Sequence, residues 1–91
     1  GQISPESGGN IADQTRGSLE KIDALLDNAG FTKKDICFVQ ILLDDIDDFT
    51  EMNRVYEQWL PNDVCFPARA AFQASKLPAD AKIEIIVQAM R

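Results

Sequence analysis

The chain has 91 residues, the length of one small domain, and we expect residues 1–91 to form a single domain. Its 9 basic and 15 acidic residues give a formal net charge of −6. That charge disfavours nucleic-acid binding, because nucleic-acid-binding proteins neutralise phosphates with clustered Lys and Arg. No apolar run approaches the roughly 20 residues that span a membrane, so we expect no membrane contact, and no signal peptide is visible at the N-terminus.

Histidine and cysteine, which often serve as metal ligands or in nucleophilic catalysis, are sparse in this chain. The chain has no histidine, which excludes Ser-His-Asp and Cys-His catalysis. Its two cysteines, Cys37 and Cys65, form no CxxC pair and make a poor start for a zinc site. We therefore expect no metal and no cofactor. Without an export signal, a reduced pair of thiols and a cytoplasmic location are favoured.

The first predicted element is a helix over residues 11–29. Asn10 is a candidate N-cap, with Asp13 three residues later as a variant of the capping box. Gly30 is placed to end the helix in the left-handed conformation. Spacings of three and four define one buried face, which Leu25 widens; its residues are Thr15, Leu19, Ile22, Leu26 and Ala29.

Residues 36–43 (ICFVQILL) are predicted to form a central strand that is buried on both faces, with Cys37 in the core. An acidic stretch, residues 44–48, follows and is interpreted as helix capping and a solvated face rather than a cation site. Asp48 can cap a second helix, with Glu51 at the N3 position, and Pro61 ends it. The apolar stripe of this helix is assigned to the core and comprises Phe49, Met52, Tyr56, Trp59 and Leu60.

Two further strands are predicted, over residues 68–74 and 82–89, with a turn at residues 77–80 between them. The order is therefore loop–α–β–α–β–β. This order predicts an α+β fold in which both helices pack on one face of a mixed sheet. Three strands are few for two helices, which suggests further sheet at the N-terminus or from a neighbouring subunit.

Five short motifs, in this order along the chain, resemble those of the YjgF/RidA (endoribonuclease L-PSP) family. The resemblance covers essentially the whole chain. The motifs are Gly1-Gln2-Ile3, which resembles the remnant of a strand; Gln14-Thr15-Arg16 opening a helix that ends in Ala29-Gly30; Asp48-Phe49 with Met52-Asn53 and Val55-Tyr56; Pro67-Ala68-Arg69; and Leu77-Pro78 followed by Lys82-Ile83-Glu84-Ile85.

The resemblance implies a chorismate-mutase-like fold and a homotrimer with a ligand cleft between adjacent subunits. Well-studied members hydrolyse 2-aminoacrylate and its imine tautomer to a 2-oxo acid and ammonia, without a cofactor. By resemblance, Arg69 pairs with the carboxylate of a small metabolite, backbone groups of Ala70 and Ala71 line the same pocket, and Gly1 lines it too. The catalytic residues stay unassigned.

Two departures from the family pattern bear on activity. The family carries further residues before the position of Gly1, so the chain is interpreted as a fragment or as a short relative. Deaminating members end in a VEIEA-like run, whereas this chain has Ile86 in place of the second glutamate. Three alternatives stay open: a weakened 2-iminobutanoate/2-iminopropanoate deaminase-like hydrolase, a non-catalytic ligand-binding or regulatory trimer, and a fragment without a competent site.

Three residues have a second interpretation. Arg69 could form an intersubunit salt bridge instead of binding a ligand, although a guanidinium matches a carboxylate bidentately. Glu84 could orient a water in place of the lost glutamate, or it could face solvent. Cys65 could be a reactive thiolate near the cleft, although packing at a loop or an interface is the more common role.

Overall fold

The computed structural model describes residues 1–61 and 67–90. The helices and strands follow one another in the order α1, β1, α2, β2, β3, and their ends agree with the predicted ranges to within one residue. Their bounds are α1 Ile11–Ala29, β1 Ile36–Leu43, α2 Phe49–Trp59, β2 Ala68–Gln73 and β3 Ile83–Ala89. Short 3-10 turns precede α1, β1, α2 and β3.

Helix α1 begins and ends where its capping residues predict. The side-chain oxygen Oδ1 of Asn10 accepts a hydrogen bond from the backbone N–H of Asp13 at 2.8 Å. Gly30 adopts a φ of 78°, and its N–H donates to the carbonyl of Asp27 at 3.1 Å. Glycine takes this left-handed conformation without steric strain, so it closes the helix in the expected way.

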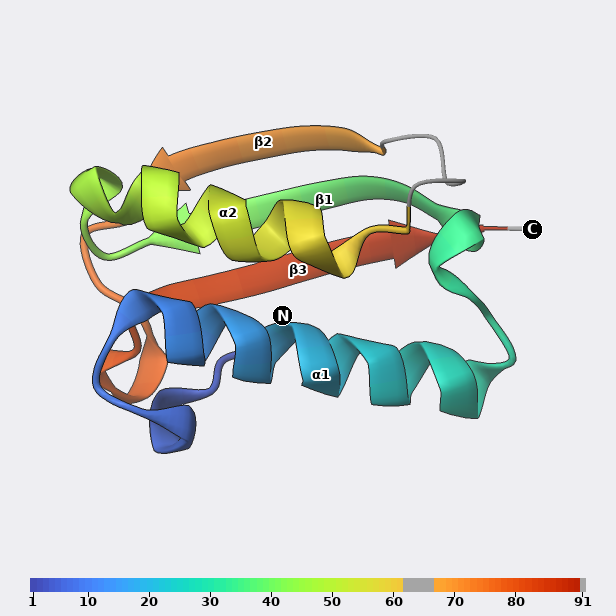
Figure 1. Ribbon diagram of the computed structural model, residues 1–91, viewed down its shortest axis with the longest axis horizontal. Helices are drawn as coiled ribbons and strands as arrows, with labels where there is room; N and C mark the ends of the chain where they lie inside the picture. Colours follow the sequence, from blue (N-terminus) through green and yellow to red (C-terminus); the bar gives the residue numbers. More distant parts are fainter. Residues whose placement is uncertain (62–66, 91) are drawn as a thin grey trace.

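The sheet is mixed, with the strand order β2-β1-β3. Strand β1 pairs in parallel with β2 and antiparallel with β3. A parallel pair needs a crossover connection, and α2 provides it between β1 and β2 (Figure 1). Along the outer edge of β3, Gln2 forms an isolated antiparallel bridge with Ile85 through backbone hydrogen bonds of 2.8 and 3.0 Å.

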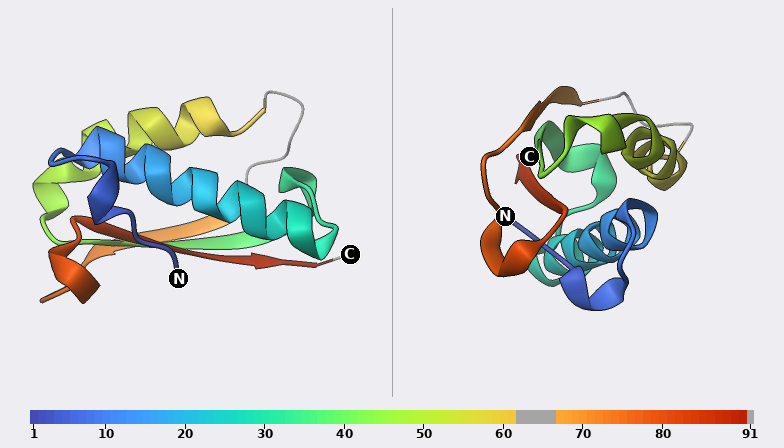
Figure 2. Two further views of the ribbon diagram at one scale, coloured as in Figure 1. Left: turned by 90° about the horizontal axis from the view of Figure 1, so that it is seen from below. Right: turned by 90° about the vertical axis from the view of Figure 1, so that its left-hand side faces the viewer.

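Both helices cover the same face of the sheet, as Figure 2 shows. The core lies between these two layers, where Val39 and Ile41 of β1 and Ile83 and Ile85 of β3 are fully buried. Met52 of α2 and Leu19 of α1 pack into it from above. The fold class is the predicted α+β arrangement, and in the described part of the chain no helix is long and apolar enough to cross a membrane.

The prediction that β1 is covered on both faces is wrong within this chain. The helices cover only the face that carries Val39, Ile41 and Leu43, and the residues between them stay partly exposed. Cys37 was assigned to the core but is exposed, and its Sγ donates a hydrogen bond to the carbonyl of Gln88 at 3.3 Å. Strand residues alternate between faces, so a continuous apolar run does not by itself bury both.

Two local predictions about the helices also need correction. Leu25 does not widen the buried face of α1: it is 51% exposed, and Ala29 at the end of that face is exposed as well. Asp48 stands at the N-cap position of α2 but makes no capping hydrogen bond. Instead Asp45 caps the preceding 3-10 turn, because its side-chain oxygen accepts a hydrogen bond from the N–H of Asp47 at 2.9 Å. This turn spans Ile46–Asp48, so most of the acidic stretch lies ahead of the helix.

Candidate functional site

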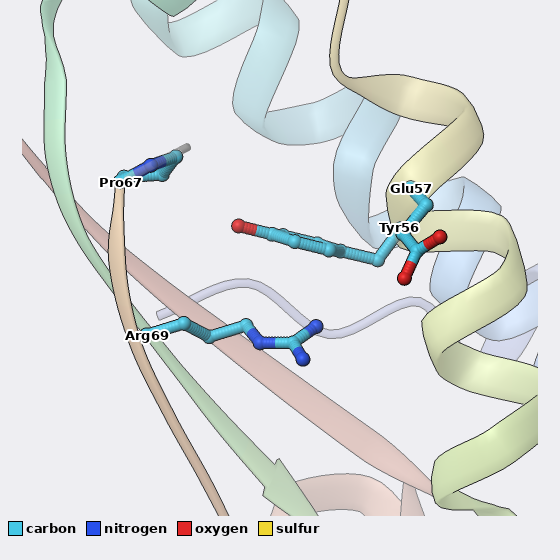
Figure 3. Close-up of a pocket in the computed structure, with 4 residues that line it drawn as sticks. All are labelled: Tyr56, Glu57, Pro67 and Arg69. Atoms are coloured by element: carbon cyan, nitrogen blue, oxygen red, sulfur yellow. The ribbon is translucent and has the colours of Figure 1, made fainter. Parts of the chain in front are cut away.

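Arg69 lies on β2, an edge strand of the sheet, directly beside Val39 of β1 in the parallel register. Its side chain extends from β2 toward α2 and is exposed (Figure 3). Among the described residues it forms no ion pair with an acid. The predicted alternative, a salt bridge to an acid of another subunit, stays a prediction.

Three side chains of α2 hold the guanidinium. Asn53 accepts a hydrogen bond from Nη1 of Arg69 through its side-chain oxygen. The guanidinium carbon lies 4.8 Å from the centroid of the Tyr56 ring and 5.5 Å from that of Phe49. Both distances are within the range of a cation–π interaction. The amide of Asn53 is itself oriented, because its Nδ2 donates to Oε1 of Glu57 at 2.7 Å.

A cavity adjoins this guanidinium and is lined by Tyr56, Glu57, Pro67 and Arg69 (Figure 3). Its volume is about 180 Å³. Pockets for drug-sized ligands measure about 300–1,000 Å³, so the dimensions suit a small metabolite. One cationic group beside a small cavity is an arrangement that can bind a carboxylate.

Tyr56 forms one wall of the cavity and belongs to the core, as predicted, with 3% of its surface exposed. Burial raises the pKa of its hydroxyl above the ordinary value of 10.0, and the positive charge of Arg69 opposes that rise. The hydroxyl has no hydrogen-bond partner in the described structure. The residue is therefore held by the packing of its ring rather than by its polar end.

The remaining residues of the predicted site lie elsewhere. Glu84 and Ile86 alternate along β3 with core residues, so their side chains leave the face of the sheet opposite the helices. Gly1 packs against both: a Cβ added there would clash with the Glu84 carboxylate and lie 3.0 Å from Cγ1 of Ile86. Gly1 and Ile86 line a second, largely apolar groove beside α1, to which Leu25 contributes.

Arg69 and Gly1 therefore lie at opposite edges of the sheet. Neighbouring strands are about 4.8 Å apart, so the three steps from β2 to the Gln2 bridge amount to roughly 14 Å. The side chain of Arg69 and that of Glu84, which lies against Gly1, also belong to opposite faces of the sheet. One small carboxylate cannot contact both groups of residues within a single chain.

Ala70 and Ala71 follow Arg69 on β2 and alternate between the two faces. Ala71 packs partly against the core, whereas Ala70 pairs with Gln40 and belongs to the open face. Their predicted contribution is through the backbone, and an edge strand leaves part of its N–H and C=O groups unpaired on the outer side. Cys65, weighed as a thiol near the cleft, lies outside the described residues.

The sequence pointed to Arg69 but not to the residues that hold it. Asn53 and Tyr56 entered the sequence analysis as members of a motif or of the core, not as neighbours of Arg69, and Glu57 had no predicted role. Their signal is the spacing from Phe49, because positions 49, 53, 56 and 57 share one face of a helix. The spacing does not show which strand this face of the helix contacts. Within residues 1–61 and 67–90, no cluster of three Asp, Glu or Cys side chains could hold a metal ion.

Comparison with protein families gives one match over the full chain: the family described as Endoribonuclease L-PSP matches residues 1–91. A RutC family protein of Pyrococcus horikoshii is 42% identical over 87 residues, which cover 91% of this chain and 68% of the relative. The Escherichia coli protein named 2-iminobutanoate/2-iminopropanoate deaminase is 33% identical over 93 residues, which cover 98% of this chain and 73% of that protein.

Solved structures agree with the sequence comparison. The crystal structure of E. coli TdcF with bound serine matches with a TM-score of 0.92 and 34% identity, covering 100% of this chain and 76% of TdcF. The structure of the E. coli YjgF gene product matches with a TM-score of 0.89 and 35% identity, covering 100% of this chain and 76% of that chain.

Proposed function

This chain belongs to the YjgF/RidA (endoribonuclease L-PSP) family, and on that premise we propose that it binds a small 2-imino or 2-oxo carboxylate at Arg69 and hydrolyses the imine form. The observation that carries the proposal is the exposed guanidinium, held by Asn53 and Tyr56 beside a small cavity. A guanidinium in a fixed orientation offers a carboxylate two parallel hydrogen bonds.

The names of two relatives support the ligand class. The E. coli relative is named for the deamination of 2-iminobutanoate and 2-iminopropanoate, both small carboxylates. TdcF is described with bound serine, an amino acid that also carries a carboxylate. Nucleic-acid cleavage, which the family description names, is disfavoured by the net charge of −6, because such an enzyme must attract phosphates.

We also propose that the binding cleft forms between copies of this chain in a cytoplasmic homotrimer. Arg69 and Gly1 are separated by the width of the sheet, so the residues that the resemblance assigns to one pocket meet only if two copies contribute. The open face of the sheet favours such contact, because Phe72 is 45% exposed there. Backbone groups of Ala70 and Ala71, on the same edge strand as Arg69, would line the pocket of one copy.

In the proposed reaction a water oxygen attacks C2 of the imine, so that a C–O bond forms and the C=N double bond becomes a single bond. Both protons of the water pass to the nitrogen, and the C–N bond then breaks. The nitrogen leaves as ammonia, and a 2-oxo acid remains. Arg69 binds the carboxylate and fixes C2 relative to the water, and such positioning can supply much of the rate. No side chain is assigned as acid or base. Because Ile86 stands at the position of the family glutamate, the usual 10²–10⁴-fold contribution of acid–base assistance is lacking, and we expect slow hydrolysis.

The test is a coupled assay in which a serine dehydratase generates 2-aminoacrylate, semicarbazide competes for it, and release of the 2-oxo acid is followed. We expect slow acceleration by the native chain, loss of it in Arg69→Met, and a gain in Ile86→Glu. Arg54→Met is the matched control, because Arg54 is an exposed arginine of α2 that pairs with Glu51 at 2.5 Å, away from the cavity. Acceleration that survives Arg69→Met would contradict the assigned role.

The second candidate is a non-catalytic trimer that binds the same ligands and acts as a sensor or regulator. Ile86 is the observation that favours it, since an isoleucine cannot position or activate a water. Calorimetric titration with 2-oxobutanoate separates the two candidates. Binding that depends on Arg69, together with no acceleration by the native chain, leaves the binding function; failure of both removes the ligand site.

A further inference from the structure

Among the described residues, the guanidinium of Arg69 contacts two aromatic rings and donates a hydrogen bond from one nitrogen. The Tyr56 ring covers a face at 4.8 Å, with Phe49 nearby at 5.5 Å. Asn53 takes one hydrogen of Nη1. No described residue bonds to Nε or Nη2, which together form one edge of the planar fork. Within residues 1–61 and 67–90, the contacts therefore restrain the plane and leave the Nε–Nη2 edge without a partner.

We infer that Tyr56 and Asn53 are positioning residues that hold Arg69 in one orientation, with its Nε–Nη2 edge presented to the carboxylate of the ligand. The inference rests on the proposed binding function and adds a cause for its affinity. A free arginine samples many rotamers, and immobilising it on binding weakens affinity. A guanidinium that is already held in the unbound protein avoids most of that loss.

The unpaired hydroxyl shows which part of Tyr56 matters. It is buried and has no partner in the described structure, so it anchors neither Tyr56 nor Arg69. The ring, in contrast, makes the contact with the guanidinium and packs into the core. A phenylalanine at this position keeps the ring and its face, whereas a leucine keeps apolar bulk but lacks the π-system that attracts the cation.

The decisive comparison is therefore between Tyr56→Phe and Tyr56→Leu. With 2-oxobutanoate as the probe in calorimetric titration, Tyr56→Phe should bind within about twofold of the native chain. Tyr56→Leu should bind about two- to tenfold more weakly, the range for mobilising one long side chain. Equal affinity of the leucine variant and the native chain overturns the inference, as does a loss of equal size in the phenylalanine variant.

A second measurement covers the case in which Tyr56→Leu fails to fold, and it uses the native chain. Tyr56 is the only tyrosine, so the phenolate absorbance reports on it alone. An anion bound to Arg69 neutralises the charge that opposes the rise of the Tyr56 pKa. Saturating 2-oxobutanoate should therefore move the phenolate midpoint upward, and an unchanged midpoint at saturation overturns the inference.

The same data separate this inference from the proposed function. If the native chain binds no 2-oxobutanoate, the binding function fails and the inference fails with it. If Arg69→Met abolishes binding while Tyr56→Leu folds and binds like the native chain, the function stands and the inference alone fails.

Discussion

Asn53 donates its side-chain amide to Oε1 of Glu57 at 2.7 Å, one helical turn further along α2. The opposite end of the same amide accepts from Nη1 of Arg69. The carboxylate of Glu57 thereby sets which way the amide faces, because only the Nδ2 end can donate to it. The arginine and the acid that line the cavity are thus linked through a single side chain.

This link predicts that Asn53→Ala weakens ligand binding without weakening the fold. Loss of one charge-assisted hydrogen bond lets the guanidinium move, and we expect affinity for 2-oxobutanoate to fall by about two- to fivefold. The matched control is Asn28→Ala, since Asn28 is an exposed helical asparagine on α1. Calorimetry on both variants checks the prediction, and an equal effect at the two positions would contradict it.

Glu57 places a negative charge in the wall of a cavity proposed for an anion. Glu57→Gln removes that charge and keeps an oxygen that can accept from Asn53. We expect carboxylate affinity to rise by about two- to fivefold at low salt, the scale of an exposed charge pair worth up to about 1 kcal/mol, and the gain to shrink at high salt. Glu20→Gln on α1 changes net charge equally and should leave affinity unchanged; a similar gain there would show a long-range effect only.

The ionisation of Tyr56 should make the fold less stable at high pH. Burial raises the pKa of the hydroxyl above 10.0 in the folded chain, so the unfolded hydroxyl loses its proton first. Above the pKa of the unfolded hydroxyl, the folded state holds more protons than the unfolded state, so the free energy of unfolding falls as pH rises. Urea titrations of the native chain and Tyr56→Phe, compared between neutral pH and pH values above 10, check this: the phenylalanine variant should lose less stability.

The contact with Arg69 makes a related prediction about the same group. The charge of Arg69 lowers the pKa of Tyr56 against the effect of burial, so Arg69→Met should raise the pKa further. Spectrophotometric titration of the phenolate in the two proteins measures this directly. A midpoint that stays in place would mean that the two side chains are not in contact in solution.

Gly17 lies where α1 crosses the N-terminal segment, and we expect Gly17→Ala to destabilise the fold by about 1–3 kcal/mol, the usual range for overpacking. An added Cβ would clash with the hydroxyls of Ser4 and Ser7 and lie 2.9 Å from Cβ of Ser4, which is buried. Rotation of the serine hydroxyls does not relieve the contact with Cβ. Lys21 further holds this segment by donating to the carbonyl of Ile3 at 2.6 Å.

Gly9→Ala is the control for this substitution, because nothing lies within 4 Å of a Cβ at Gly9. Its effect should stay within about 0.5 kcal/mol, as for most surface changes. Urea unfolding followed by the fluorescence of Trp59, the only tryptophan, measures both variants. Equal stability of the two would show that Ser4 and its neighbours shift readily.

Local signals in the sequence were sufficient for the elements. The cap at Asn10 and the left-handed Gly30 set the two ends of α1 through contacts between residues that are close in the chain. Such contacts form in the same way whatever surrounds them. The same holds for β1, whose apolar run marks a strand. The fold class followed from the order of these elements, and Arg69 followed from resemblance to the family.

Tertiary structure alone decided what surrounds Arg69. Helix α2 could turn any of its faces toward β2, and only its packing on the sheet places Asn53 and Tyr56 against the guanidinium. The exposure of Cys37 was likewise set by which face of the sheet the helices cover, and that of Leu25 by which side of α1 packs on the sheet. Periodicity fixes which residues share a face, because it follows from backbone geometry. What that face meets depends on contacts between residues far apart in the chain, which no local pattern encodes.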